Sequence, residues 1–211
     1  MYQVPQFREE SLAAKHDLIR ANPLGMLISH GPDGLLANPI PFLLYDEGDK
    51  GTLRCHLSRA NGQWQALRDS PEALVVFQGV DRYVTPSWYP AKAEHGKVVP
   101  TWNYAMVQAR GSARIIEDAA WLLANVSALS DAHEGRRQKP WAVSDAPESF
   151  IAGQLKGIVG VEIVIEKIDG KFKASQNRSV ADRTGVAEGL AAEGDGAALM
   201  MRELVKERGG V

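Results

Sequence analysis

The sequence contains a single cysteine, Cys55, and this scarcity excludes two kinds of stabilising site. One cysteine cannot form a disulfide within the chain, and it cannot supply a cysteine-based zinc site. The histidines offer no alternative, because all five are scattered without the spacing of metal ligands. Cys55 lies in the apolar run TLRCHL, so we interpret it as a small buried hydrophobic side chain rather than a nucleophile. We therefore expect no metal site.

The sequence also lacks a large excess of either charge and any long apolar segment. Its 24 Lys and Arg residues against 26 Asp and Glu residues give a formal net charge of -2, which provides no global attraction to nucleic acid or anionic membranes. No apolar run approaches the roughly 20 residues that a membrane-spanning helix needs. The segment MYQVPQFREE has no apolar region typical of a signal peptide. These absences predict a cytoplasmic protein without a membrane partner.

Common catalytic and nucleotide-binding motifs are absent as well. No GxGxxG follows a predicted strand and no GxxxxGK[ST] is present, which argues against Rossmann and P-loop sites. No Ser-His-Asp or Cys-His arrangement is evident, and the carboxylates of Asp17, Asp33 and Asp46 lie in predicted turns or on a helix surface. The sequence therefore identifies no catalytic residue.

What the sequence does contain is a series of short apolar runs separated by turn formers, which predicts a mainly β-structure with added helices, an α+β fold. Predicted strands cover 24–30, 35–45, 52–57, 73–78, 82–85, 103–116, 156–168 and 171–174, the last two as a hairpin around Asp169-Gly170. Predicted helices cover 10–21, 63–68, 118–129, 147–155 and the tail from 179 onward, and Asp118 is expected to cap the third of them. Because strands and helices do not alternate regularly, an antiparallel barrel with attached helices fits better than a doubly wound sheet.

The second predicted strand contains Pro39 and Pro41 in alternation with Ile40 and Phe42. Proline cannot donate a hydrogen bond to a neighbouring strand, so we expect this segment to be an edge strand or to be bulged. Its backbone would then face something other than a neighbouring strand.

The segment CHLSRANGQW suits an anion, because a strand ends at Ser58 and Arg59 and a helix begins after Asn61. Free N–H groups at the start of a helix favour a phosphate, and an arginine can add charge-assisted hydrogen bonds worth roughly 1.5–3 kcal/mol each. His56 lies on the same strand and could contact such a ligand. The alternative is an ordinary helix cap with a solvated arginine, which spacing alone favours.

Two further segments could line a ligand site. Aromatic side chains gather around a predicted loop over 86–101, where Trp88 and Trp102 could stack on a flat ligand or could fill the barrel or a dimer interface. The segment SQNR at 175–178 follows a strand, and its amides could bind the edge of a heterocycle. A capped loop that leads into the last helices explains SQNR about equally well.

Taken together, these segments resemble the PaiB-type family of FMN-binding negative transcriptional regulators. The resemblance keeps its order and spacing along nearly the whole chain, through NPLGMLISH (22–30), HLSRANGQW (56–64), VFQGVDRYVTPSWYP (76–90), GKVVPTWNYAMV (96–107), PWAVSDAP (140–147) and KFKASQNR (171–178). It implies an FMN-binding split β-barrel similar to pyridoxamine-phosphate oxidases, over residues 1–175, with a helical tail over 176–211 packed on it. It also implies a homodimer that holds FMN where the two subunits meet.

The resemblance assigns cofactor-binding roles to residues in four segments. Ser58 and Arg59 would hold the phosphate, with Ala60 and Asn61 as backbone donors and His56 near the phosphate or ribityl chain. The isoalloxazine ring would lie alongside Asn38, Pro39, Ile40 and Pro41. The site would be closed by Trp88, Trp102 and Asn103, in one arrangement from the second subunit. Its edge would be completed by Ser175, Gln176 and Asn177. The chain departs from the family pattern at Gln108 and Arg110, where histidines are usual, and at Ala174, where leucine is usual.

Three functions follow from the resemblance as alternatives: a negative transcriptional regulator that binds FMN, a flavin-dependent oxidoreductase, and a haem-binding relative. No helix-turn-helix with a basic recognition face supports DNA as a partner. The basic residues of the tail, Arg202, Lys206 and Arg208, alternate with Glu203 and Glu207, which is typical of a solvated helix face.

Overall fold

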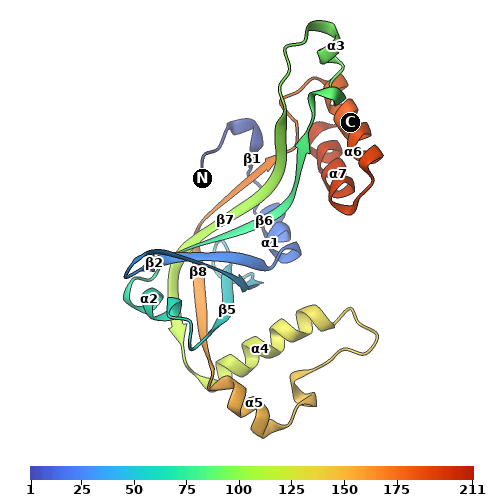
Figure 1. The fold of residues 1–211 in the computed structure, drawn as a ribbon. Helices are drawn as coiled ribbons and strands as arrows, with labels where there is room; N and C mark the ends of the chain where they lie inside the picture. Colours follow the sequence, from blue (N-terminus) through green and yellow to red (C-terminus); the bar gives the residue numbers. More distant parts are fainter. The chain divides into compact units, whose positions relative to one another are not determined.

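The computed structural model describes residues 1–211, and the chain divides into two compact units. The terminal unit contains residues 1–18, 78–107 and 169–211. The central unit contains residues 19–77 and 108–168. Figure 1 traces the chain through both of them.

The strands form one sheet in the order β3-β2-β6-β7-β8-β5-β4, and β1 pairs with β8. Their bounds are β1 (Arg8–Glu9), β2 (Leu24–Gly31), β3 (Gly34–Pro41), β4 (Leu43–Tyr45), β5 (Thr52–Ser58), β6 (Glu72–Val84), β7 (Thr101–Ile116) and β8 (Ile158–Lys173). The pairs β1–β8, β2–β3, β2–β6, β4–β5 and β5–β8 are all antiparallel, as the sequence predicted. Strands β6, β7 and β8 contribute residues to both units.

The helices occur at the start, in the middle and at the end of the chain. Their bounds are α1 (Leu12–Ala21), α2 (Gln63–Asp69), α3 (Ala91–His95), α4 (Ala119–Glu134), α5 (Glu148–Leu155), α6 (Val180–Glu193) and α7 (Gly196–Gly209). Asp118 caps α4 by accepting a hydrogen bond from the backbone N–H of Trp121, as its type and position predicted. The helix continues to Glu134, five residues beyond the predicted end at Leu129.

Closure of the sheet depends on Phe42. Strands β3 and β4 lie at opposite ends of the sheet order, yet only Phe42 separates them in the chain. The two end strands therefore come close to each other at Phe42, which curls the sheet into a barrel, but β3 and β4 do not pair with each other. Phe42 is almost fully buried, and its ring lies edge-on to Phe77 with centroids 5.8 Å apart. An edge-to-face aromatic pair adds roughly 0.5–1.5 kcal/mol to the free energy gained by burying the two rings.

In the strands of the central unit, every second side chain points into the core. In β5, Leu53, Cys55 and Leu57 face inward and are fully buried, whereas Arg54 and His56 face the other side. Cys55 is thus the buried hydrophobic residue that the sequence predicted. Burial without a charged partner raises the pKa of its thiol far above the usual range, which keeps the sulfur unreactive.

The terminal unit has its own apolar cluster, formed mainly by α6 and α7. Val186 and Leu190 of α6 pack with Met201 and Val205 of α7, and all four are fully buried. The two helices are joined at Gly194 and Asp195. Gly194 adopts the left-handed conformation with φ 71°, and Asp195 caps α7 through the backbone N–H groups of Ala197 and Ala198.

The predicted hairpin around Asp169-Gly170 is wrong, because β8 runs without a break from Ile158 to Lys173. Gly170 pairs with Glu9 of β1 instead of turning. An added Cβ at Gly170 would lie 2.9 Å from the Cβ of Glu9 and 2.8 Å from the side chain of Lys15. The glycine is therefore explained by close packing of the N-terminal segment, which local turn propensity does not reveal.

The division of residues 73–85 into two strands is also wrong, because β6 is continuous from Glu72 to Val84. Gly79, at the predicted break, lies close to Ala105 of β7 and Leu18 of α1. The predicted loop over 86–101 contains two short helical segments, Pro86–Trp88 and α3. Across the whole structure, no helix combines the length and the apolar character needed to span a membrane.

Candidate functional site

The corner between β5 and α2 is a tight turn built by its own side chains. The hydroxyl of Ser58 accepts a hydrogen bond from the backbone N–H of Ala60 at 3.3 Å, and the backbone N–H of Asn61 donates to the carbonyl of Ser58 at 2.9 Å. The side-chain oxygen of Asn61 accepts from the backbone N–H of Gln63 at 3.0 Å. Short polar side chains favour this turn because they bond the nearby backbone. The corner thereby holds Arg59 at the surface of the central unit.

Arg59 is held in a defined orientation although its side chain is 40% exposed. Its Nε donates to the carbonyl of Lys156 at 3.1 Å, and its Nη2 donates to the carbonyl of Ile158 at 3.3 Å. Its Nη1 donates to the carboxylate of Glu117 at 2.6 Å. Each terminal nitrogen carries two hydrogens, so one N–H on each remains available to an anion. The guanidinium is thus preorganised with donors to spare.

Glu117 sets the electrostatic balance at this corner. Its carboxylate is more than half exposed and is the one acidic group that pairs with Arg59. An anion that approaches Arg59 would be repelled by this carboxylate, or would replace it as the partner of Nη1. Because both charges are partly solvated, the Arg59–Glu117 pair contributes little to stability, on the order of 0–1 kcal/mol. Glu117 therefore offsets part of the positive charge that Arg59 presents at the surface.

Gln63 links this corner to β3, a connection that the sequence analysis missed. The side chain is 1% exposed, and its Nε2 donates to the carbonyl of Leu27 at 3.0 Å and to the hydroxyl of Ser29 at 3.1 Å. Its Oε1 accepts from the side-chain Nδ2 of Asn38 at 2.9 Å. A polar residue among buried neighbours in the first turn of α2 was the available signal. The network brings together two predicted site segments, 38–41 and 58–61.

Strand β3 has the open edge that its prolines predicted. It lies at the end of the sheet order and pairs on one side only, with Asn38 opposite Leu27 and Pro39 opposite Met26. Backbone groups on the other side of an edge strand have no strand partner and can bind a ligand. Pro39 and Pro41 are exposed, whereas Ile40 points into the core.

His56 lies against α4. Its Nδ1 is 3.4 Å from the side-chain Nδ2 of Asn125, a residue that is itself almost fully buried. Burial lowers the pKa of His56 because the protonated ring loses hydration. A neutral imidazole beside an amide can accept its hydrogen bond, so we interpret His56 as a residue that positions α4.

The remaining predicted site residues, Trp88, Trp102, Asn103, Ser175, Gln176 and Asn177, belong to the terminal unit. Asn103 is fully buried and bonds to Ser175 of the SQNR segment. The side-chain oxygen of Gln176 accepts from the backbone N–H of Ala174 at 2.7 Å, and its Nε2 donates to the carbonyl of Phe172 at 2.6 Å. The polar side chains of Ser175 and Gln176 thus shape the loop, and Asn177 is exposed.

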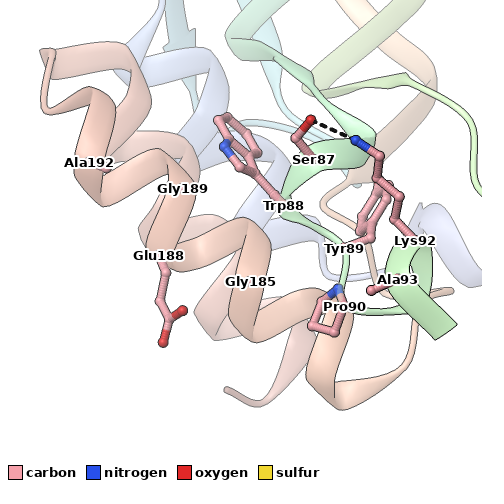
Figure 2. A pocket seen from close by; sticks show the side chains of 10 residues that line it. All are labelled: Ser87, Trp88, Tyr89, Pro90, Lys92, Ala93, Gly185, Glu188, Gly189 and Ala192. Atoms are coloured by element: carbon pink, nitrogen blue, oxygen red, sulfur yellow. Dashed lines mark hydrogen bonds between the residues drawn. The ribbon is translucent and has the colours of Figure 1, made fainter.

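The ring of Trp88 packs against α6 and forms one wall of a cavity of about 760 Å³ (Figure 2). An added Cβ at Gly189 would lie 2.5 Å from the indole nitrogen, so this glycine makes room for the ring. Opposite charges flank the cavity, because Lys92 and Glu188 both line it. The Nζ of Lys92 donates to the hydroxyl of Ser87 at 3.2 Å.

Trp102 is exposed on β7 beside a second cavity of the terminal unit. Its side chain is 54% exposed and lies edge-on to Tyr83, with ring centroids 6.0 Å apart. The cavity measures about 340 Å³ and is lined by Gln78, Asp81, Trp102, Tyr104 and Met106. An exposed aromatic pair next to a cavity is typical of a surface that binds a ligand or a partner.

Comparison with known proteins identifies the family to which the chain belongs. Residues 1–167 match the model of the family described as "Putative FMN-binding domain". The chain belongs to this family, and FMN is the cofactor that membership assigns to it. The predicted resemblance and the predicted cofactor are confirmed.

Curated relatives cover nearly the whole chain. An uncharacterised protein of Emericella nidulans is 36% identical over 99% of this chain and 98% of its own length. The protease synthase and sporulation protein PAI 2 of Bacillus subtilis is 28% identical over 99% of this chain and 98% of its own length.

A solved structure shares the fold. The FAD and heme binding protein from Mycobacterium smegmatis superimposes with a TM-score of 0.58 and 19% identity, over 79% of this chain and 73% of that one. At this level of identity the comparison establishes the fold alone, and it confirms the predicted split β-barrel.

The corner and β3 fit FMN. A phosphate needs charge and N–H donors at an exposed position, and Arg59 supplies both beside the hydroxyl of Ser58. A flat ring system needs a strand edge that is not already paired, and β3 supplies it. The Gln63 network fixes the distance between these two features.

Proposed function

We propose that this protein is a homodimeric FMN-binding protein of the PaiB type, located in the cytoplasm, whose bound flavin controls a negative regulatory role in transcription. The Gln63 network carries the proposal, because it joins the exposed guanidinium corner to the open edge of β3 in one rigid arrangement. Bound FMN supplies reversible uptake of one or two electrons.

The residues of the central unit would hold the cofactor by its two ends. Arg59 and Ser58 bind the phosphate. The N–H groups of Ala60 and Asn61, predicted as further donors, already donate to the hydroxyl and the carbonyl of Ser58, so they stabilise the turn instead. The edge of β3 at 38–41 runs along the isoalloxazine ring, where backbone groups set the polarity around the ring nitrogens. Such hydrogen bonds are one means by which a protein adjusts the reduction potential of a flavin.

The second subunit would close the site. Trp102 is the strongest candidate for this role, since it is exposed, lies edge-on to the exposed ring of Tyr83 and borders a cavity. Trp88, Asn103 and the loop at 175–177 belong to the same unit and would approach with it.

The regulatory role is supported by the similarity to PAI 2 across the whole chain. The structure favours control through the flavin or a protein partner over contact between α7 and DNA. Arg202 pairs with Glu203 at 2.7 Å, and Arg208 pairs with Glu9 and Glu207, so these basic side chains are already neutralised. A DNA-binding helix needs free cations that can reach phosphates.

The alternative is a flavin-dependent oxidoreductase, which the open cavity beside Trp102 favours because a substrate could enter it. The spectrum of the purified protein distinguishes a flavoprotein, with its yellow colour, from a haem protein, with its Soret band. A shift of the DNA upstream of its own gene in an electrophoretic assay at low salt would support direct repression. If the purified protein binds no FMN when titrated with it, the proposal is wrong.

A further inference from the structure

A group of cations in the terminal unit has no acidic partner. Lys171 and Lys173 lie on β8, and Arg178 follows in the SQNR segment. None of the three forms an ion pair with a carboxylate, although the chain carries more acidic than basic residues. Their polar contacts are to neutral groups: the Nζ of Lys171 donates to the carbonyl of Tyr2, and the Nζ of Lys173 donates to the hydroxyl of Thr101.

The three cations are close enough to repel one another. Burial lowers the pKa of Lys173, and the charges of Lys171 and Arg178 lower it further. Lys171 is itself nine-tenths buried. Holding like charges together in a partly desolvated place costs free energy that no paired carboxylate offsets. An anion at this place would remove the repulsion.

Aromatic rings adjoin the same cations. The Nζ of Lys171 lies 5.4 Å from the ring centroids of both Tyr2 and Tyr104, and the guanidinium of Arg178 lies 4.6 Å from that of Tyr89. Tyr104 also lines the cavity beside Trp102. The cation of Lys171 and the 340 Å³ cavity therefore share one wall, the ring of Tyr104.

The cavity complements a flat molecule. Trp102 and Tyr104 offer aromatic surface, Met106 offers a polarisable apolar contact, and Gln78 can donate or accept hydrogen bonds. Asp81 is the only acidic residue in the lining, and it can accept a hydrogen bond from a ring N–H or an amino group. These features suit a heteroaromatic ring.

We propose that this face of the terminal unit binds a planar aromatic molecule that carries an oxyanion, with the ring in the cavity beside Trp102 and the oxyanion on Lys171, Lys173 and Arg178. Two sources share this chemistry. One is a separate phosphorylated aromatic molecule. The other is FMN itself, whose phosphate would then lie here and not on Arg59, so this source competes with the phosphate placement of the proposed function.

The test uses the purified protein with whatever flavin it retains and titrates it with 4-nitrophenyl phosphate, inorganic phosphate and 4-nitrophenol by calorimetry. We expect 4-nitrophenyl phosphate to bind more tightly than either of its parts. Lys173→Met keeps the aliphatic stem and removes the charge, and it should weaken binding of the probe at least about tenfold. Lys173→Arg should retain most of the affinity.

Lys139→Met is the matched control, because it removes the same charge from an exposed position in the central unit. Circular dichroism establishes that each variant is folded, and Lys173→Gln replaces Lys173→Met as the charge-removing variant if Lys173→Met does not fold. FMN affinity is measured in parallel by flavin fluorescence. Loss of probe binding with unchanged FMN affinity supports a separate ligand.

A tenfold loss of FMN affinity in Lys173→Met supports FMN as the anion and moves its phosphate away from Arg59. The inference is overturned if Lys173→Met changes neither affinity, or if the wild-type protein binds 4-nitrophenyl phosphate no better than phosphate. A wild-type protein that binds the probe but no FMN would refute the proposed function and leave this inference standing.

Discussion

Asn103 and Ser175 form a closed side-chain pair inside the terminal unit. The Nδ2 of Asn103 donates to the hydroxyl of Ser175 at 2.9 Å, and that hydroxyl lies 3.3 Å from the Oδ1 of Asn103, to which it can donate in turn. Both residues are almost fully buried. Ser175 is also the only non-glycine residue with positive φ, at 64°. The pair therefore holds the start of the SQNR loop in a conformation that serine alone disfavours.

Asn103→Leu should destabilise the protein by roughly 1–3 kcal/mol, because it leaves the buried hydroxyl of Ser175 without its partner. Urea unfolding followed by fluorescence measures the effect. Ser175→Gly leaves the buried amide of Asn103 without its partner, but it should cost less because glycine adopts positive φ without strain, which offsets part of that loss. Equal losses in both variants would show that the pair does not stabilise the loop in this way.

Arg59→Ala should weaken FMN binding while the protein keeps its oligomeric state, because it removes the guanidinium from the corner. Loss of a charge-assisted hydrogen bond worth roughly 1.5–3 kcal/mol corresponds to an affinity lower by about one to two orders of magnitude. Arg68→Ala is the control, since the guanidinium groups of Arg59 and Arg68 both lie over the ring of Trp64, at 5.9 and 5.6 Å, but Arg68 makes no contact with the corner carbonyls. Unchanged affinity in Arg59→Ala would remove the phosphate assignment.

Glu117→Gln should act in the opposite direction and strengthen FMN binding several-fold. The substitution removes the negative charge beside Arg59 and retains a hydrogen-bond acceptor. Because the repulsion is electrostatic, the gain should shrink as salt concentration rises. FMN titrations at low and high ionic strength measure both effects, and a weaker affinity in Glu117→Gln would contradict the placement of the phosphate.

Gln63→Leu should lower both stability and FMN affinity. The leucine leaves the side chain of Asn38 and the hydroxyl of Ser29 without a partner in a buried place, at a cost of roughly 1–3 kcal/mol in unfolding free energy. Gln65→Leu introduces the same residue at an exposed position of α2 and is the control. If Gln63→Leu loses stability but binds FMN normally, the network does not position the site.

Acid should destabilise the central unit through Glu162. Burial alone would raise the pKa of this carboxyl, but hydrogen bonds and charges from Arg114 and Arg54 outweigh it and hold the pKa below its usual value of 4.5. A carboxyl whose pKa is lower in the folded state stabilises the protein above the unfolded pKa. That contribution is lost as pH falls from about 4.5 through the folded value.

The measurement is unfolding free energy against pH in the wild type and in Glu162→Gln. The variant should be less stable at neutral pH and should lose less on acidification below about 4.5. His56 adds a separate loss that begins at higher pH, because burial lowers its pKa and protonation favours the unfolded state below about 6.5. Parallel curves for the wild type and Glu162→Gln below pH 4.5 would contradict this role of Glu162.

The sequence predicted what depends on local chemistry. Pro39 and Pro41 cannot donate to a ladder, and β3 is indeed an edge strand. Asp118 was expected to cap a helix, and it does. The position of Cys55 in the apolar run TLRCHL predicted its burial, and it is buried. In each case neighbours in the chain decide the outcome, so the residue type is enough.

Features that depend on residues distant in the chain were not predicted. Gly170 was interpreted as part of a turn, but its role is to accommodate Glu9, a residue about 160 positions away in the chain. The Gln63 network was missed because its partners Leu27, Ser29 and Asn38 lie on two other strands. The roles of the predicted cofactor-binding residues stay predictions, because the assignments rest on resemblance and no ligand contact tests them.

Phe42, the single residue between β3 and β4, couples the two edges of the barrel. A slip of β3 by one position against β2 would draw β4 by the same step along β5, and would place side chains of both strands on the wrong face. The register of the β2–β3 pair therefore constrains the register of the β4–β5 pair, and the reverse also holds. A deletion or insertion at this position should be tolerated far less than one in the exposed turn at 46–49, even though both lie between strands that are consecutive in the chain.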